Sequence, residues 1–364
     1  MEKGKISSLQ MAIMMYPTIV ATAILGVPSV TAKYAKNDLW LSPIFGALIG
    51  YVTVYIVYKL HKLYPKQTVI QFSEQIIGWI PGKILGFLYL FFYIPITGQI
   101  LREYGEFVVD SFMVNTPIIV IMTSMVLLCA LIVRGGIEVL GRAADLFLPI
   151  FIFPLIFLMI LLGSDLEFKN IFPILGDGIM PPIKGAIIPG GWFSEFFMLI
   201  FLLPFLADRK KGMKYGMMTV FAVMITLVVV NLIVLFVLGE TTSSKVYPLM
   251  NVSRYISFAD FFEHLESTVM AIWVVGAFVK ISVFYYVAAL STAQWLNLSD
   301  YRPIVWPIGI LIVVFAFWSF PSAIEVDRYD VIAFPFHGIL MQTIIPLFLL
   351  VIAVVRNRKK ETDN

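Results

Sequence analysis

Charged residues and cysteine are both scarce in this chain of 364 residues. Only 13% of the residues are charged, whereas 60% are hydrophobic and the mean hydropathy is +0.92. A soluble domain has about 25% charged residues, so the composition excludes that class and indicates a polytopic membrane protein. The single cysteine, Cys129, lies in an apolar stretch and has no partner within the chain. An internal disulfide is therefore excluded, and cysteine usage says nothing about the redox compartment.

Histidine is equally scarce, and familiar catalytic motifs are missing. The three histidines, His61, His264 and His337, fall in different segments, so a metal cluster is not expected. The sequence has no glycine-rich phosphate loop, no nucleophile motif and no soluble stretch long enough for a catalytic domain. The basic run at residues 209–211 is typical of a membrane anchor rather than of a nucleic-acid site. We therefore expect no enzyme activity, no cofactor and no nucleic-acid partner.

What the chain does contain is a series of ten apolar segments. They lie near residues 7–35, 39–62, 82–109, 116–134, 139–162, 184–207, 213–239, 266–292, 303–320 and 331–355. Most match the ~20 residues that a helix needs to cross the hydrocarbon of a bilayer. The prediction is an all-α polytopic membrane protein with ten transmembrane helices, in which residues 1–364 form a single transmembrane domain.

The distribution of lysine and arginine predicts the orientation. If the N-terminus is cytoplasmic, seventeen of the 26 basic residues fall on the inner side, eight fall outside, and Lys280 alone lies within a helix. The inner residues include a basic tail at residues 356–364, whereas the outer loops are rich in acids. Because cytoplasmic loops carry the excess of basic residues, we expect both termini in the cytoplasm.

Two of the apolar segments contain helix-disrupting residues at mid-depth. The first segment contains Gly26 and Pro28, and the sixth contains the run Ile188-Pro189-Gly190-Gly191-Trp192-Phe193-Ser194-Glu195. Irregular backbone at this depth is tolerated only where it is buried in protein or lines a cavity. We therefore expect helices 1 and 6 to be broken. The other interpretation is that Gly26 and Pro28 only kink a helix for packing.

The order of elements repeats after five segments. An amphipathic stretch at residues 69–77 precedes segment three, and another at residues 254–265 precedes segment eight. Because five is odd, a second copy of five helices enters the membrane upside down. The sequence thus predicts an inverted repeat of five plus five helices, with copies at about residues 7–162 and 184–355. Such a repeat places a ligand site at the bilayer midplane, between the two broken helices.

The two interrupted segments also carry a family resemblance. Ala21-Thr22-Ala23-Ile24-Leu25 followed by Pro28 resembles the first-helix motif of the amino acid–polyamine–organocation superfamily. With the element at residues 190–195 and the ten spans, the whole chain resembles the B subunits of spore germinant receptors, the endospore germination permease-like proteins. The resemblance implies a LeuT-like fold in the spore inner membrane. It also implies a small-molecule germinant, an A-type membrane subunit and a C-type lipoprotein subunit as partners.

The expected ligand is a zwitterionic amino acid. Amides freed near residues 23–26 would favour its carboxylate, and carbonyls freed near residues 18–21 and 189–191 would accept hydrogen bonds from its ammonium. Alanine replaces the family's glycine at Ala21 and Ala23, which indicates either a smaller ligand or a lesser role for this motif. The candidate ligand-binding residues are Ala21, Thr22, Ala23, Ile24, Leu25, Gly26, Tyr93, Thr97, Gly190, Gly191, Trp192, Glu195 and Phe284.

Two charged residues at membrane depth are functional candidates by default. Glu195 could receive a ligand amine, carry a proton or cap freed amides of a half-helix. Lys280 lies mid-span in the eighth segment, where the sodium-coupled relatives of this fold form a cation site. Its ammonium could take the place of that cation, which would make the chain independent of sodium. The alternatives for Lys280 are snorkelling and a structural pair with Glu195 or Asp145.

Two functions fit these features. One is a transporter-like nutrient sensor that binds a germinant and signals to partner subunits. The other is an amino acid permease driven by protons or sodium, and a route for water or ions is a third option. A sensor needs only a ligand that shifts one conformational equilibrium, whereas a permease must alternate between two sides.

Overall fold

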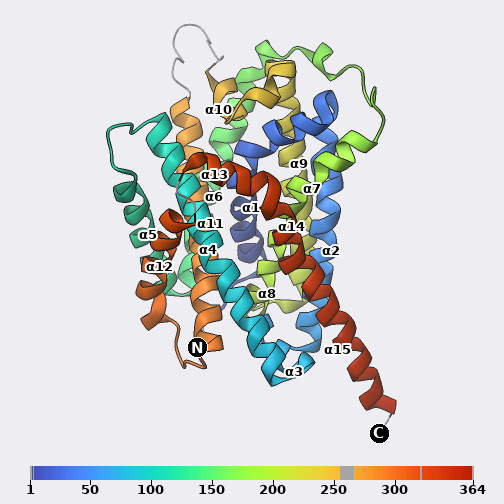
Figure 1. The fold of residues 1–364 in the computed structure, drawn as a ribbon, viewed down its shortest axis with the longest axis vertical. Helices are drawn as coiled ribbons and strands as arrows, with labels where there is room; N and C mark the ends of the chain where they lie inside the picture. The colour runs from blue at the N-terminus through green and yellow to red at the C-terminus, as the bar shows by residue number, and fades with distance from the viewer. Residues whose placement is uncertain (1, 3, 255–265, 320–321, 363–364) are drawn as a thin grey trace.

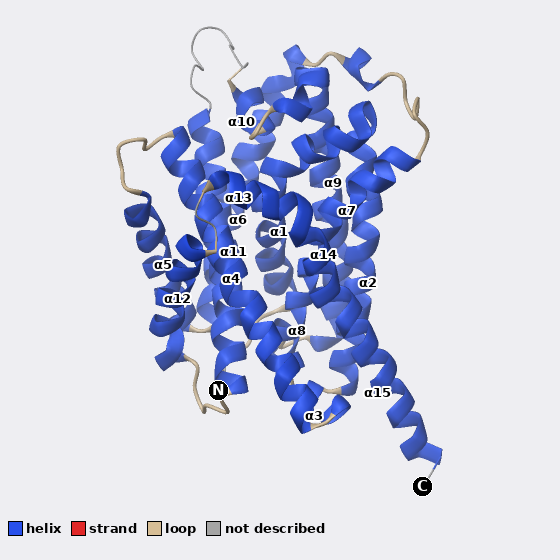
Figure 2. Ribbon diagram, in the orientation of Figure 1, coloured by secondary structure: helices blue, strands red, loops and turns tan. Residues whose placement is uncertain are grey.

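The computed structural model describes residues 2, 4–254, 266–319 and 322–362, and this part of the chain is a bundle of helices without a β-sheet (Figures 1 and 2). The α-helices are α1 (Ser8–Ala35), α2 (Ser42–Leu63), α3 (Val69–Ile77), α4 (Trp79–Ser111), α5 (Ile118–Gly135), α6 (Ile137–Leu161), α7 (Met180–Ser194), α8 (Leu199–Leu202), α9 (Gly212–Leu238), α10 (Pro248–Ser253), α11 (Glu266–Trp295), α12 (Val305–Trp318), α13 (Ala323–Arg328), α14 (Phe334–Ile339) and α15 (Ile345–Thr362).

All the predicted apolar segments are helical. Among the described residues, eight helical stretches are long and apolar enough to cross a membrane. The first of them, Ser8–Leu63, contains both α1 and α2, joined through the 3₁₀ turn Lys36–Leu41. The ninth predicted segment is the shorter apolar helix Arg302–Trp318. The all-α membrane fold is therefore confirmed, because each segment has enough apolar length to form its own helix.

The helices differ in how much of their surface the protein itself covers. In the stretch Met180–Phe205 the most apolar window is 94% buried, whereas in Ile137–Leu161 it is only 22% buried. α1 is likewise buried along most of its length and lies at the centre of the bundle (Figure 1). A helix that is apolar all round and buried belongs in the core, while one with an exposed apolar face suits lipid. The first and sixth segments are thus core elements.

The first helix differs from our expectation of a break. α1 runs as one α-helix from Ser8 to Ala35 with Pro17 and Pro28 inside it. Each proline removes only one backbone donor, and nearby threonine hydroxyls bond to carbonyls of the adjoining turns. Thr18 donates to the Met14 carbonyl at 2.7 Å, and Thr31 donates to the Val27 carbonyl at 2.7 Å. The kink interpretation therefore fits the first segment better than an unwound backbone.

The sixth segment does change its helical geometry, but later than expected. α7 continues as an α-helix through residues 188–191 and ends at Ser194. A 3₁₀ turn, Glu195–Met198, follows directly, then the single turn α8 and a second 3₁₀ turn, Leu203–Phe205. A stretch of 3₁₀ helix within a span often marks strain or a functional hinge. The irregularity of this segment thus begins at Glu195.

The paired glycines of α7 have a packing role. A Cβ atom on Gly190 would lie 2.6 Å from Cδ1 of Ile49 in α2, and one on Gly191 would lie 2.9 Å from Cα of Pro335 in α14. Distances below 3.0 Å are not tolerated without movement, so glycine lets α2 and α14 approach α7. We expected freed backbone carbonyls near residues 189–191, but α7 is helical through these residues.

The tenth segment contains two turns that the sequence did not lead us to expect. It is interrupted by π-helical turns at Tyr329–Ala333 and Leu340–Ile344, on either side of α14. Such turns are rare and occur often at functional sites. Each contains a polar residue, Asp330 in the first and Gln342 in the second.

A short N-terminal segment closes the end of the bundle where the chain begins. Ile6 forms an isolated parallel bridge with Leu206, and the Ile6 amide donates to the Phe205 carbonyl at 3.1 Å. The Glu2 carboxylate accepts from the Ile137 amide at 3.0 Å and from the Tyr301 hydroxyl at 2.9 Å. The segment therefore connects three parts of the chain that are distant in sequence.

Both ends of the chain lie at the same end of the bundle (Figure 1), as an even number of crossings requires. The side on which they lie stays a prediction from the distribution of basic residues. Of the two amphipathic stretches, residues 69–77 form α3. In the second, at 254–265, residues 255–265 lie outside the described residues.

Candidate ligand site

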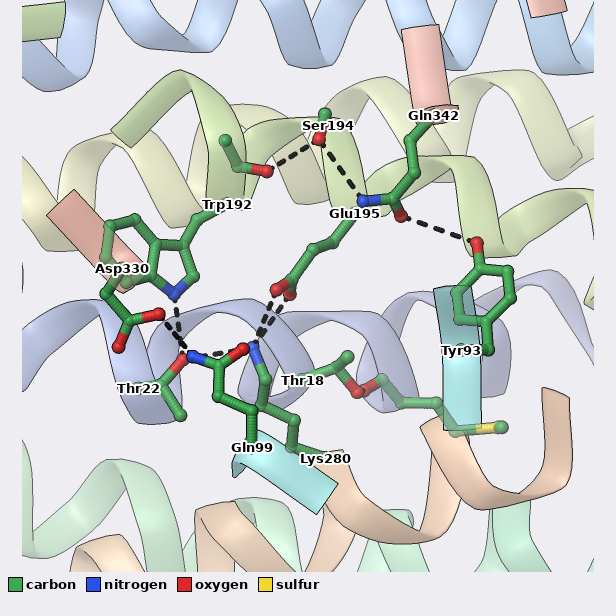
Figure 3. A network of polar contacts seen from close by, with 12 residues as sticks. Thr18, Thr22, Tyr93, Gln99, Trp192, Ser194, Glu195, Lys280, Asp330 and Gln342 are labelled. Atoms are coloured by element: carbon green, nitrogen blue, oxygen red, sulfur yellow. Dashed lines mark hydrogen bonds and ion pairs between the residues drawn. The ribbon is translucent and has the colours of Figure 1, made fainter. Parts of the chain in front are cut away.

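Three polar side chains from the first, sixth and eighth segments meet at the centre of the bundle. Nζ of Lys280 in α11 lies 2.8 Å and 2.9 Å from the two carboxylate oxygens of Glu195. It also donates to Oγ1 of Thr22 in α1 at 3.0 Å (Figure 3). The exposed fractions are 1% for Lys280, 2% for Glu195 and 2% for Thr22. The charges are therefore paired away from solvent, and Glu195 rather than Asp145 is the partner of Lys280.

This pair is stable only as a unit. Removing two opposite charges from water carries a large desolvation penalty, which close contact and full hydrogen bonding offset. Lys280 has three N–H donors, and Glu195 and Thr22 accept from them. The Lys280 ammonium also lies 5.2 Å from the centre of the Phe284 ring, one helical turn along α11, within cation–π range. The Lys280 ammonium is thus held by a carboxylate, a hydroxyl and an aromatic ring, and its replacement of a bound cation stays a prediction.

Trp192 connects the pair to a cavity. Its indole Nε1 donates to Oγ1 of Thr22 at 2.9 Å (Figure 3). Trp192 is 5% exposed, and it also lines a cavity of about 410 Å³. Pockets for small molecules have volumes of roughly 300–1,000 Å³, so this cavity is large enough for an amino acid. One side chain therefore touches both the cavity and the buried cluster.

The cavity, which we call the vestibule, opens between several elements away from the chain ends. Its wall comes from residues 25–33 of α1, residues 103–110 of α4, residues 243–247 before α10, and residues 326–331. Both signs of charge occur along it, from Lys33 and Lys245 and from Glu103, Asp110 and Asp330. A further acid in the wall, Glu106, pairs with Arg102 at 2.5 Å. A wall of this kind can bind an ammonium and a carboxylate on the same molecule.

The profile of the spore germination protein family matches residues 5–324. The chain belongs to this family. Spore germination protein KB of Bacillus subtilis (strain 168) is 26% identical over 369 residues, covering 99% of this chain and 98% of the relative. Spore germination protein YndE of the same organism is 27% identical over 370 residues, with 98% of each chain covered. The resemblance noted in the first and sixth segments is thereby confirmed.

Solved structures show the fold of this family member. A substrate-bound, outward-open Na⁺-coupled sialic acid symporter has a TM-score of 0.68 and 12% identity, over 96% of this chain and 89% of that one. MhsT in complex with L-phenylalanine has a TM-score of 0.66 and 13% identity, over the same shares of the chains. The LeuT-like transporter fold is therefore confirmed. At this identity the likeness concerns the fold alone.

The predicted site residues separate into groups. Leu25, Gly26 and Trp192 line the vestibule. Thr22, Glu195, Lys280 and Phe284 form the buried cluster beneath it. The remaining residues are buried and do not line the vestibule: Ala21, Ala23, Ile24, Tyr93, Thr97, Gly190 and Gly191. Whether any of these residues binds a ligand stays a prediction.

Two predicted residues belong to other hydrogen bonds. The Thr97 hydroxyl donates to the Tyr93 carbonyl of its own helix at 2.6 Å. The Tyr93 hydroxyl donates to Gln342 at 3.4 Å, and Gln342 donates in turn to the Ser194 hydroxyl at 3.4 Å (Figure 3). Tyr93 thus connects α4 to the second π turn and to the end of α7.

The polar residues of the tenth segment were missing from our candidates. Gln342 is fully buried among the hydrogen bonds just described, and Asp330 accepts from Gln99 of α4 at the vestibule wall (Figure 3). The available signal was a glutamine inside an otherwise apolar span, because a buried amide needs partners on neighbouring helices. The wall at residues 243–247 lies in a loop, where no periodic pattern could indicate it.

Proposed function

We propose that this chain is the nutrient-sensing subunit of a spore germinant receptor, and that a small zwitterionic germinant such as an amino acid binds in the vestibule above Trp192. Membership of the spore germination protein family supports the receptor assignment. The volume of about 410 Å³ and the presence of both charge signs on the wall support the class of ligand. The proposed setting is the spore inner membrane with both termini cytoplasmic, together with an A-type membrane subunit and a C-type lipoprotein subunit.

The observation that carries the proposal is the Lys280–Glu195 pair beneath the vestibule. An ammonium fixed to α11 at 2.8 Å from Glu195 cannot leave with a ligand, unlike a bound sodium ion. An ion gradient would then have no bound ion to move at this place. A ligand can still act by binding one conformation of the bundle better than another, and its differential affinity sets the size of the shift. Sensing requires nothing more than this.

A proton- or sodium-coupled amino acid permease is the second candidate, because the fold is shared with a symporter. The two functions predict different fates for a bound amino acid. The test uses the purified chain in liposomes and a panel of radiolabelled amino acids, with sodium present or replaced by choline. We expect saturable binding that is unchanged by choline, without accumulation inside the liposomes. Accumulation driven by a sodium or proton gradient would establish the permease instead.

The location of the ligand has its own test at Gly26. A Cβ atom on Gly26 would meet no other atom within 4 Å, and Gly26 lines the vestibule. Gly26→Trp is therefore expected to fill the cavity without disturbing the helix and to abolish amino acid binding. Gly163, which also has open space at its Cβ position, lies outside the vestibule wall and provides the matched control Gly163→Trp. Normal binding by Gly26→Trp would place the ligand elsewhere.

Assembly is tested by co-expression. If the chain is a receptor subunit, it should co-purify from membranes with A-type and C-type subunits encoded beside it, and ligand affinity measured on the complex should exceed that of the chain alone. Recovery of the chain without either subunit, from a membrane that contains both, would contradict the receptor assignment.

A further inference from the structure

The helices α2 and α9 approach each other unusually closely through glycines. A Cβ atom on Gly50 would lie 3.2 Å from Val220, one on Gly216 would lie 3.0 Å from Val54, and one on Gly212 would lie 3.9 Å from Tyr58. From one contact to the next, the residue number rises by four in α2 and falls by four in α9. The two helices are therefore antiparallel, and the last turn of α2 lies beside the first turn of α9.

Basic residues gather where these two helix ends meet. If the same register is extended by four residues, Lys62 lies at the level of residue 208. Residue 208 directly precedes the basic run at residues 209–211. The α2–α9 basic cluster consists of Lys59, Lys62, Arg209, Lys210, Lys211 and Lys214. All except Arg209 are exposed, and Arg209 is close enough to act electrostatically on the buried ring of His61 in α2. Six positive charges thus share one small area.

Within the described part of the chain, none of the six members of this cluster forms a salt bridge. The adjoining carboxylate of Asp208 interacts electrostatically with Lys211 and accepts hydrogen bonds from the Ser8 amide at 2.7 Å and the Ser8 hydroxyl at 2.8 Å, so a single acid adjoins six basic residues. Three basic residues elsewhere at the same end do have acidic partners. Lys83 lies 3.2 Å from Glu74, Arg142 lies 4.0 Å from Glu138, and Arg302 lies 3.6 Å from Asp300.

The surroundings of the cluster are those of a membrane interface. Lys59 Nζ lies 5.2 Å from the ring centre of Tyr55, which is 45% exposed on the apolar outer face of α2. Tyrosine is enriched at the level of lipid headgroups, and lysine stems lie along apolar surface with the ammonium in the headgroup layer. An anion that neutralises the cluster would therefore sit at headgroup depth.

We propose that the α2–α9 basic cluster binds the phosphate groups of an anionic phospholipid in the adjoining leaflet. Close packing of the two helices forces like charges together, and a phosphate between the helix ends relieves their repulsion. The positive-inside rule accounts for basic residues anywhere on this side of the protein. It does not account for the concentration of six basic residues beside a single carboxylate, Asp208, at this one junction. The proposal is independent of whether the chain senses or transports a ligand.

The test compares lipid binding by two triple variants of the full chain. The cluster variant carries Lys59→Gln, Lys62→Gln and Lys210→Gln, and the control carries Lys5→Gln, Arg134→Gln and Arg142→Gln at the same end. Cardiolipin is titrated into zwitterionic detergent micelles while the apparent Tm is followed. Each lysine near a headgroup contributes about 1 kcal/mol, or roughly fivefold in affinity, so the cluster variant should bind cardiolipin on the order of a hundredfold more weakly. The control should bind like the unchanged chain.

Three outcomes would overturn the proposal. The first is an equal loss of affinity in both variants, which would indicate general attraction to a positive surface. The second is stabilisation of the same size by inorganic phosphate without cardiolipin, which would indicate a site for free anions. The third needs no substitution and so applies even if the cluster variant does not fold. The cardiolipin-induced rise in Tm of the unchanged chain should disappear at high NaCl, and a rise unaffected by salt would exclude binding through phosphate.

Discussion

Removing one charge of the Lys280–Glu195 pair should destabilise the protein more than any other single charge removal. The two side chains are 1% and 2% exposed and lie 2.8 Å apart. Lys280→Gln leaves the Glu195 carboxylate buried without a counter-charge, which costs about 3–5 kcal/mol, and Glu195→Gln has the same effect on the ammonium. For a chain of this size the loss corresponds to a fall in apparent Tm on the order of 5–10 °C.

The double variant separates pairing from simple loss of contact. Lys280→Gln combined with Glu195→Gln buries two neutral amides, so no uncompensated charge remains. Its cost should therefore be well below the sum of the two single costs, with a coupling free energy of at least about 3 kcal/mol. The measurement is thermal unfolding in detergent for all four proteins of the cycle. Costs that simply add would refute the reasoning, because they would mean that the two charges are independently hydrated.

The molecule contains its own comparison for this experiment. Lys36 and Asp177 also lie 2.8 Å apart, but their side chains are 75% and 62% exposed. Water screens such a pair, so Lys36→Gln should leave the apparent Tm unchanged. If Lys36→Gln and Lys280→Gln lowered the Tm equally, burial could not be the cause of the effect at Lys280.

Three further predictions concern other contacts. Gly191→Ala places a Cβ atom 2.9 Å from Cα of Pro335 and should cost about 1–3 kcal/mol in thermal unfolding, whereas an unchanged Tm would mean that α14 does not pack there. Thr22→Val removes the hydroxyl that accepts from Trp192 and should cost about 1–3 kcal/mol, while Thr22→Ser keeps that acceptor and should cost less; equal losses would argue against the hydrogen bond. Burial raises the pKa of Asp208, but hydrogen bonds, chiefly from Ser8, together with the charge of Lys211 outweigh burial and hold this pKa below the usual 3.8. A lowered pKa stabilises the folded state above pH 3.8, and this stabilisation is lost as the pH falls further. Asp208→Asn should therefore reduce the acid sensitivity of unfolding below that pH. An identical pH profile of the variant and the unchanged chain would contradict this.

The fold was predictable because its main determinant is local. Each apolar segment is long enough to form a spanning helix by itself, so a hydropathy pattern finds it without knowledge of its neighbours. The irregularities were harder to place. Pro28 with Gly26 suggested a break in the first segment, but the hydroxyls of Thr18 and Thr31 bond to carbonyls of α1, which continues through both residues. A sequence shows which residues can disrupt a helix, but it does not show whether the helix continues through them.

The site was predictable in chemistry but only partly in geometry. Lys280 and Glu195 lie at membrane depth, where a charged side chain requires a partner. For Lys280 the sequence left two alternatives, Glu195 and Asp145. Asp145 instead accepts from Gln10 at 2.9 Å. The choice depends on how α11 is rotated against the 3₁₀ turn at Glu195, which no local pattern encodes. The vestibule was not predictable as a cavity, because its wall combines residues from five distant parts of the chain.

The N-terminal segment has a consequence for biosynthesis. Glu2 is made well before its hydroxyl partner, Tyr301, which follows 299 positions later in the chain. Asp208, which accepts a hydrogen bond from the Ser8 amide at the start of α1, likewise follows Ser8 by 200 positions. Contacts between residues so far apart form late and slow folding. The ribosome must therefore complete eight of the ten spans before the contact between Glu2 and Tyr301 can form, so this end of the bundle reaches its final set of contacts late in synthesis.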